Sequence, residues 1–464
     1  MRRIKLMVTV LLLGGFITSF SETLLNNALP TIMREVHVSQ MTAQWLSTGY
    51  LLAAGIMMPV AAYFTNRFRL RPLFIGLMLV FLLGTVTAVT ASSFAQLFIG
   101  RIIQALSVGI SMPLTQNVIS LLFPPEQRGI ALGLAGVVIN LGPAMGPTIS
   151  GYIVDHYSWR MLFIILIPLA LLVILLGLVF VKNVTKTVAD SVDTLSVVYS
   201  SLGLGSLLYG LSLVGVDGGV SLTAIITVVV GVAVLVLFVR RQFRLTKPLL
   251  ELRAFKAASF SKVVVVALFS AISLMGPELI VPLYNQNIHG LTAMTSGLLL
   301  LPGALLMAIL SPISGKLYDL FGIKALAYVG YGLTLIATIP MLWFDRQTSL
   351  LTIILSYAAR VAGLTLVYMQ VNVNGLNALP KDYVVHGSTI IVTIQQVASS
   401  FGTALLVAIV SFVQRRQGMR GVPADTATAM GYHWAFIVVF IISAICLLGS
   451  LLLKNKTTPE VEAL

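Results

Sequence analysis

Apolar runs of about twenty residues recur along the whole chain and constrain its fold more than any other feature. A helix of that length crosses the ~30 Å hydrocarbon core of a bilayer, where only helices and closed barrels satisfy the backbone. Only 9% of the 464 residues are charged, whereas soluble domains carry roughly 25%. We therefore expect an all-α membrane protein with fourteen spanning helices, at 7–28, 42–64, 72–91, 95–121, 128–153, 160–181, 195–215, 219–240, 258–286, 291–313, 324–343, 349–378, 386–413 and 433–453.

Loop charges orient these helices. An even number of spans places both termini on one side, where about 20 Lys and Arg fall in loops, against about six on the other side. Because basic loops stay inside, we expect a multi-pass protein of a bacterial cytoplasmic membrane with both termini in the cytoplasm. The basic 414–432 loop goes against this trend. Anionic lipid headgroups then account for the net charge of +14, without a nucleic-acid partner.

The first apolar run is expected to remain in the mature chain. It is too long for the apolar region of a signal peptide, and it holds Glu22 and Asn26 where a cleavage site would need small residues. The single cysteine, Cys446, excludes an intramolecular disulfide.

Matching features suggest an internal duplication. Arg101 and Arg360 each lie inside the fourth span of a group of six, and Glu22 and Glu278 each lie in the outer part of a first span. This arrangement is typical of transporters whose substrate site lies between two bundles. We therefore expect an N-terminal six-helix bundle, two inserted spans with their linkers, and a C-terminal six-helix bundle, at 1–181, 182–256 and 257–464.

Two acidic residues within the spans, Glu22 and Glu278, are the first candidates for function. A carboxylate at that depth costs about 2.5–3.5 kcal/mol and usually faces a cavity. Desolvation disfavours its charged form, which suits a group that carries a proton. The alternatives are structural: Glu22 could bind Asn26 one turn on, and Glu278 could belong to a polar network freed where Pro277 and Pro282 break the helix.

Two long motifs resemble one transporter family. The runs at 21–30 (SETLLNNALP) and 136–151 (GVVINLGPAMGPTISG) are similar to the first-span and fifth-span motifs of the fourteen-span drug:proton antiporters of the major facilitator superfamily, the EmrB/QacA/LmrB-like exporters. Shorter matching runs at 101–105 (RIIQA), 123–129 (FPPEQRG) and 158–160 (SWR) keep the same order, and the resemblance covers essentially the whole chain.

The resemblance implies a major facilitator fold and a proton-coupled multidrug efflux antiporter. It would be a monomer among membrane lipids that exports amphipathic, cationic or zwitterionic drug-like compounds by alternating access. A proton gradient would drive it, with no cofactor and no enzymatic activity. Arg101 would tune the first-span proton site, with Glu22 as a partner, although a purely structural tie stays open. The implied antiporter motif comprises Gly142, Pro143, Gly146, Pro147 and Gly151, and the same glycines would let helices pack closely.

The family also carries a gating loop after the second span of each half. The matching residues are Asn66, Arg67, Arg71, Gly315, Asp319, Gly322 and Lys324. The N-terminal copy departs from the pattern, because Asn66 replaces the usual Asp and Arg69 replaces a Gly. Many relatives also carry Asp at the position of Ser21, whereas here the acid is Glu22.

Polar and aromatic side chains in central spans are candidates for substrate contact, each with helix–helix packing as the alternative. These are Asn26, Trp45, Tyr50, Gln104, Gln116, Asn117, Asn140, Tyr284, Arg360, Tyr368, Gln370, Asn374 and Gln395.

Other functions have less support. The chain has no Gly-rich loop ending in Gly-Lys-Ser/Thr, so ATP is not expected to drive it, and its five histidines lack metal-site spacing. A dedicated exporter or flippase for a lipid, peptide or metabolite remains an alternative. A membrane-embedded transferase would need larger external loops with catalytic residues than this chain has.

Overall fold

A computed structural model describes residues 2–25, 28–38, 40–124, 131–132, 134–136, 142, 145–146, 149–154, 156–184, 193–216, 221–246 and 248–455. Its α-helices are α1 (Arg2–Thr23), α2 (Leu29–Val36), α3 (Gln40–Met57), α4 (Ala61–Arg67), α5 (Leu70–Val89), α6 (Phe94–Leu122), α8 (Met161–Ile164), α9 (Leu166–Phe180), α10 (Thr194–Val216), α11 (Leu222–Arg244), α12 (Ala258–His289), α13 (Ala293–Thr338), α14 (Leu350–Asn377), α15 (Val384–Gly418) and α16 (Ala424–Gly449). Short 3₁₀ helices are η1 (Leu252–Lys256), η2 (Pro340–Trp343), η3 (Lys381–Tyr383) and η4 (Ser450–Leu452).

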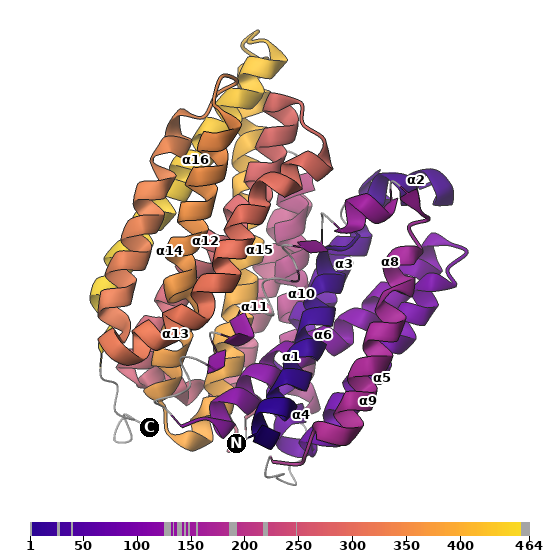
Figure 1. Cartoon of the computed structure of the whole chain (residues 1–464), viewed down its shortest axis with the longest axis vertical. Helices are drawn as coiled ribbons and strands as arrows, with labels where there is room; N and C mark the ends of the chain where they lie inside the picture. Colours follow the sequence, from indigo (N-terminus) through magenta and orange to yellow (C-terminus); the bar gives the residue numbers. More distant parts are fainter. Residues whose placement is uncertain are drawn as a thin grey trace.

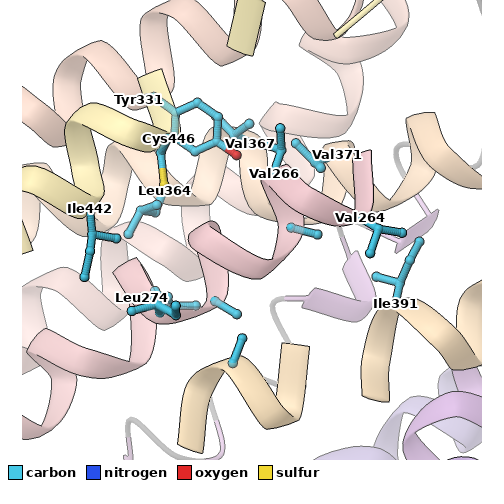
Figure 2. Close-up of a cluster of buried hydrophobic side chains, with 14 of the residues drawn as sticks. Val264, Val266, Leu274, Tyr331, Leu364, Val367, Val371, Ile391, Ile442 and Cys446 are labelled. Carbon is cyan, nitrogen blue, oxygen red and sulfur yellow. The ribbon is translucent and has the colours of Figure 1, made fainter. Parts of the chain in front are cut away.

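The helices form two bundles with separate apolar cores. Helices α1, α3–α6, α8 and α9 surround a core that includes Phe74 and Trp159. Helices α12–α16 surround a second core that includes Phe260 and Tyr331 (Figure 1). Figure 2 shows part of the second core, where Tyr331 and Cys446 lie among aliphatic side chains. Both termini lie at the same end of the molecule (Figure 1).

Eleven stretches of the described helices are long and apolar enough to cross a membrane. One of them, Met294–Trp343, is 50 residues long and holds a break at Gly322, whose φ of 75° and ψ of 176° are not helical. Helix α3 is a shorter apolar helix, and much of the expected fifth span at 128–153 lies outside the described residues. The total of fourteen spans therefore stays a prediction.

The two bundles meet at the end that carries the termini and diverge toward the other end (Figure 1). A small apolar cluster joins them there: Val8 and Leu12 near the start of α1, Ile119 near the end of α6, and Val373 near the end of α14. Tyr318 of α13 packs against the same cluster. The space between the two bundles is therefore closed at the end of the molecule that carries the termini.

Candidate functional site

Arg101 is the centre of the polar site in the N-terminal bundle. Its side chain is completely buried in α6, and its Nη1 donates to the carbonyl oxygen of Ser21 at 3.0 Å and to Ser21 Oγ at 3.2 Å. Its Nε donates to the carbonyl of Leu46 at 3.4 Å. The last four carbonyls of a helix have no partner within it, and Ser21 is one of them because α1 ends at Thr23. The end of α1 therefore supplies acceptors for a buried cation.

Two residues that were predicted to contact substrate, Gln104 and Tyr50, instead bind Arg101 and form part of this site. Gln104 accepts from Arg101 Nη1 at 3.1 Å and donates to Thr85 Oγ1 at 2.8 Å. The guanidinium of Arg101 lies 3.8 Å from the ring centroid of Tyr50, a cation–π contact, and the Tyr50 hydroxyl donates to the carbonyl of Thr18 at 3.2 Å. Both side chains therefore hold Arg101 in place.

Glu22 reaches Arg101 through its backbone. Arg101 Nη2 donates to the carbonyl of Glu22 at 3.5 Å, while the half-buried Glu22 carboxylate forms no salt bridge within the described part of the chain. The guanidinium is still close enough to act on that carboxylate electrostatically. Asn26, the alternative partner of Glu22, lies outside the described residues. Arg101 therefore lies beside Glu22 but binds a cluster of carbonyl groups and not the Glu22 carboxylate.

The glycines of the antiporter motif pack directly against this end of α1. A methyl group built on Gly142 would lie 2.8 Å from the backbone nitrogen of Phe20, and one on Gly146 would collide with Thr23 Oγ1. Gly151 is buried, whereas Pro143, Pro147 and Asn140 lie outside the described residues. The motif therefore fixes the backbone on both sides of Glu22.

Glu278 occupies the corresponding helix of the C-terminal bundle. Its side chain is half-buried in α12, within electrostatic range of Tyr357, Tyr368 and Glu22. The expectation that Pro277 and Pro282 break this helix is wrong, because α12 runs without interruption from Ala258 to His289. Each proline instead removes one backbone donor from a continuous helix.

Arg360 uses a carbonyl freed in this way. Pro277 has no N–H to donate to the carbonyl of Ser273, four residues earlier, and Arg360 Nη2 donates to that oxygen at 2.5 Å and to Ser273 Oγ at 2.7 Å. Arg360 is completely buried, and its Nε and Nη1 have no hydrogen-bond partner in the described structure. It binds inside its own bundle, with no substrate-facing surface in this state.

The amides predicted for substrate contact in α14 and α15 bind groups on other segments of the C-terminal half. Gln370 donates to Ser314 Oγ at 3.1 Å, and Asn374 donates to the carbonyl of Lys454 at 3.1 Å. Gln395 and Asn372 exchange two hydrogen bonds, of 3.2 and 3.3 Å. A substrate that bound these groups would have to replace those bonds.

The other candidates are dispersed. Trp45 is half-buried and stacks on Tyr209 of α10, with ring centroids 5.4 Å apart. Tyr284 lies in an outer aromatic cluster with Phe344, where its hydroxyl donates to the carbonyl of Asp345 at 2.6 Å. Gln116 and Asn117 are buried in α6, and both polar atoms of Asn117 lack a partner in the described structure. Among the described residues, no group of three or more His, Cys, Asp or Glu could hold a metal ion.

Comparison with known proteins identifies the family. A model described as Major Facilitator Superfamily matches residues 11–403. The chain belongs to the major facilitator superfamily. It is 41% identical to the uncharacterized MFS-type transporter YcnB of Bacillus subtilis, over 99% of this chain and 97% of that protein. It is 36% identical to the lincomycin resistance protein LmrB of Listeria monocytogenes, over 96% of this chain and 95% of the other.

Solved structures of other facilitators share the fold. The human organic anion transporter MFSD10 (TETRAN) superposes with a TM-score of 0.64 over 95% of this chain and 99% of its own, at 15% identity. The proton:xylose symporter XylE superposes with a TM-score of 0.67 over 100% of this chain and 98% of its own, also at 15% identity. Identity this low shows the fold alone. As a facilitator, the chain is a transporter and not an enzyme.

Each gating loop of this facilitator is bound by an asparagine that was not among the predicted residues. In the N-terminal half, the backbone N–H of Arg71 donates to Asn183 Oδ1 at 3.0 Å. In the C-terminal half, the backbone N–H of Lys324 donates to Asn455 Oδ1 at 2.7 Å, and Asn455 also lies against Gly322. Each Asn therefore caps the start of the third helix of its half.

A signal for these caps was present in the sequence. Each half of the facilitator ends its last span with an aliphatic residue followed by Lys and Asn, at 181–183 and 453–455. Arg67, Asp319 and Lys324 are exposed, Gly315 is buried, and the Asn66 side chain lies outside the described residues.

Proposed function

We propose that this facilitator is a proton-coupled multidrug efflux antiporter of a bacterial cytoplasmic membrane, with both termini in the cytoplasm. It exports amphipathic, cationic or zwitterionic compounds. The observation that carries the proposal is the Glu22 site. The Glu22 carboxylate lies inside a membrane bundle with no salt bridge in the described structure, and a buried arginine, Arg101, binds the backbone carbonyls of Glu22 and of its neighbour Ser21. A group built in this way can exchange a proton without losing its position.

Arg101 and Glu22 have separate tasks in this mechanism. Arg101 is held by the carbonyls of Ser21 and Leu46, so its charge stays fixed while Glu22 changes protonation state. Its positive charge stabilises the Glu22 carboxylate after proton release, and burial favours the protonated form. Glu278 acts as a second acidic group in the opposite half, for another proton or a cationic substrate.

Alternating access couples this proton to export. The two halves are in contact at the end of the molecule that carries the termini. With the termini in the cytoplasm, this arrangement corresponds to a transporter that is open to the outside. Glu22 takes up a proton from outside, the bundles rock, and the proton leaves to the cytoplasm. Each inward proton contributes about 2.3 kcal/mol per 100 mV of membrane potential, so no nucleotide or cofactor is needed. Relatives named as lincomycin resistance proteins support drug-like substrates.

The test uses purified protein in liposomes with an imposed pH gradient and a pH-sensitive dye. Ethidium, lincomycin and a set of neutral compounds are added separately, and proton release is followed for wild type and for Glu22→Gln. We expect compound-driven proton release from wild type and none from Glu22→Gln. The Asp425→Asn variant, which changes an exposed carboxylate bound to Arg346 at 2.6 Å, serves as the matched control and keeps full activity.

The outcomes separate the alternatives. Compound transport without proton release would contradict the antiporter. Proton release that survives in Glu22→Gln and is lost in Glu278→Gln would move the proton site to the C-terminal half. Absence of flux with every drug, together with flux of a lipid or metabolite, would replace multidrug export by a dedicated exporter.

A further inference from the structure

We propose that the inserted helices α10 and α11 move with the C-terminal bundle, and that the contact between α3 and α10 is the surface that slides during transport. This inference rests on the alternating access proposed above. It assigns the inserted pair to one of the two moving bodies, which neither the family match nor the relatives specify. Four sets of contacts carry it.

The inserted helices form one rigid pair. A methyl group built on Gly231 of α11 would lie 2.5 Å from the backbone nitrogen of Leu207 in α10, and one on Gly210 would lie 2.9 Å from the backbone nitrogen of Val228. Small residues that let two backbones approach this closely are the usual packing device of membrane helices. Asp193 and Arg241 then join the ends of the pair through two bonds of 2.7 Å. The two helices therefore have little freedom to move apart.

A chain of hydrogen bonds ties this pair to the C-terminal bundle. Gln242 of α11 donates to Ser196 Oγ of α10 at 2.6 Å and accepts from the backbone N–H of Leu250 at 3.2 Å. The next residue, Glu251, donates its backbone N–H to Nδ1 of His386 in α15 at 3.4 Å. These bonds connect α10, α11, the linker and α15 in sequence.

Apolar packing follows the same division. Phe238 of α11 and the linker residues Leu249, Leu250 and Leu252 belong to the buried core of the C-terminal bundle. Within the described residues, the N-terminal core takes none of its members from 194–244. Directional hydrogen bonds and a shared apolar core thus join the inserted pair to the C-terminal bundle.

The contact with the N-terminal bundle has a different character. Several contacts between α10 and α3 are aromatic or aliphatic: Trp45 stacks on Tyr209, and a methyl group on Gly205 would lie 3.2 Å from Cδ1 of Ile56. On the other helix, Gly55 faces Leu208. Apolar surfaces with small residues can slide past one another, because dispersion contacts are individually weak and non-directional. Helix α10 also packs on α15, so it lies along the seam between the halves (Figure 1).

Cross-linking tests which contact must move. On a Cys446→Ala background, one variant carries Ile56→Cys with Gly205→Cys, across α3 and α10. The matched control carries Glu251→Cys with His386→Cys, across the linker and α15. Both are reconstituted, cross-linked with a short thiol reagent and assayed for export before and after reduction. We expect the α3–α10 cross-link to abolish export reversibly and the linker–α15 cross-link to leave it within about twofold of the reduced protein, a change of less than about 0.5 kcal/mol in the barrier.

The reverse pattern would assign the pair to the N-terminal half and overturn the proposal. Export that survives both cross-links, or is lost with both, would also overturn it, because neither fits a pair that moves with one half.

A second measurement needs no transport activity. Spin labels are placed on exposed positions, at Val229 in α11 with either Leu83 in α5 or Leu448 in α16. Between acidic and alkaline buffer, the 229–83 distance should shift by several ångströms while the 229–448 distance stays constant. A shifting 229–448 distance would contradict the inference even if the protein proved not to be a drug antiporter.

Discussion

The two bundles solve the same problem, a buried arginine in the fourth span, in different ways. Arg101 is held by Ser21, Gln104, Leu46 and the Tyr50 ring, and the Ser21 carbonyl is free because α1 ends there. Among the described residues, the Arg360 side chain binds Ser273 alone, at a carbonyl that Pro277 leaves free within a continuous helix. Every side-chain nitrogen of Arg101 has a hydrogen-bond partner, whereas Nε and Nη1 of Arg360 have none in the described structure.

The helix crossings show that the two arginines are not strict equivalents. Gly100 packs on the backbone at Gly84 and Ala88, and Gly363 packs on Gly330 and Thr334 in the same manner. Arg101 follows its crossing glycine by one residue, whereas Arg360 precedes its own by three, a difference of about one helical turn. The two halves therefore share the helix crossing but not the position of the buried charge. We take this as a sign that the proton chemistry resides in the N-terminal half.

Replacing each arginine in turn should give the largest difference in stability between the two halves. Arg101→Met leaves several buried acceptors without a donor, at about 1–3 kcal/mol each, so we expect a marked loss of thermal stability and no transport. Arg360→Met leaves one carbonyl unpaired but removes a buried charge with two idle donors, so its unfolding free energy should stay within about 1 kcal/mol of wild type. Thermal unfolding in detergent, followed by tryptophan fluorescence, measures both. Equal losses in the two variants would refute the asymmetry.

The glycines that pack beside each serine sharpen the comparison. Gly142 faces the backbone nitrogen of Phe20, and Gly402 of α15 faces Ile272, so each glycine contacts the residue before the arginine-binding serine. A methyl on Gly142 meets backbone, which cannot rotate away. A methyl on Gly402 first meets the Ile272 side chain, at 2.6 Å.

We expect Gly142→Ala to reduce export about tenfold or more, which corresponds to about 1.4 kcal/mol, and Gly402→Ala to reduce it less. Gly76→Ala, at a glycine with open space around it, is the control. Initial rates of export in liposomes decide the order. A stronger effect at Gly402 would place the sensitive helix in the other half.

The caps at the gating loops should behave alike, because both halves have the same kind of cap. Asn183 and Asn455 each accept one backbone N–H at the start of a helix. Losing such a cap typically costs about 1 kcal/mol. Asn183→Ala and Asn455→Ala should therefore lower the melting temperature by similar small amounts, and the Asp variants, which still accept, should restore it. A loss confined to one variant would show that the two loops are anchored differently.

The sequence predicted the large features because membrane burial leaves few choices. Apolar length predicted the helices, and Glu22, Arg101 and Arg360 were found because charges in such helices are rare and costly. The roles of Gln104, Tyr50 and Asn372 could not be read in this way. Whether a polar side chain faces a cavity or a neighbouring helix depends on helix rotation, which the hydropathy of a nearly all-apolar span does not encode. The uninterrupted α12 was also hidden, because the partner of its freed carbonyl lies 87 residues away.

The smallest effect is expected at the outer ends of the halves, where each bundle has an ion pair. In the N-terminal half, the hydrogen bond from Arg160 holds the pKa of Glu35 below its ordinary value, and Trp159 Nε1 also donates to Glu35 at 2.7 Å. In the C-terminal half, Arg346 and Asp425 are both exposed.

A lowered carboxyl pKa means that the Glu35 contacts stabilise the fold above the ordinary pKa of 4.5 and lose that contribution as the pH falls through the lower, folded value. Because the pair is partly exposed, we expect a contribution of less than about 1 kcal/mol. The melting temperature of Glu35→Gln should lie below that of wild type at neutral pH, and the two should converge on acidification below about pH 4.5. Asp425→Asn should match wild type throughout. A gap between Glu35→Gln and wild type that persisted at low pH would assign the loss to the Trp159 contact and not to the charge.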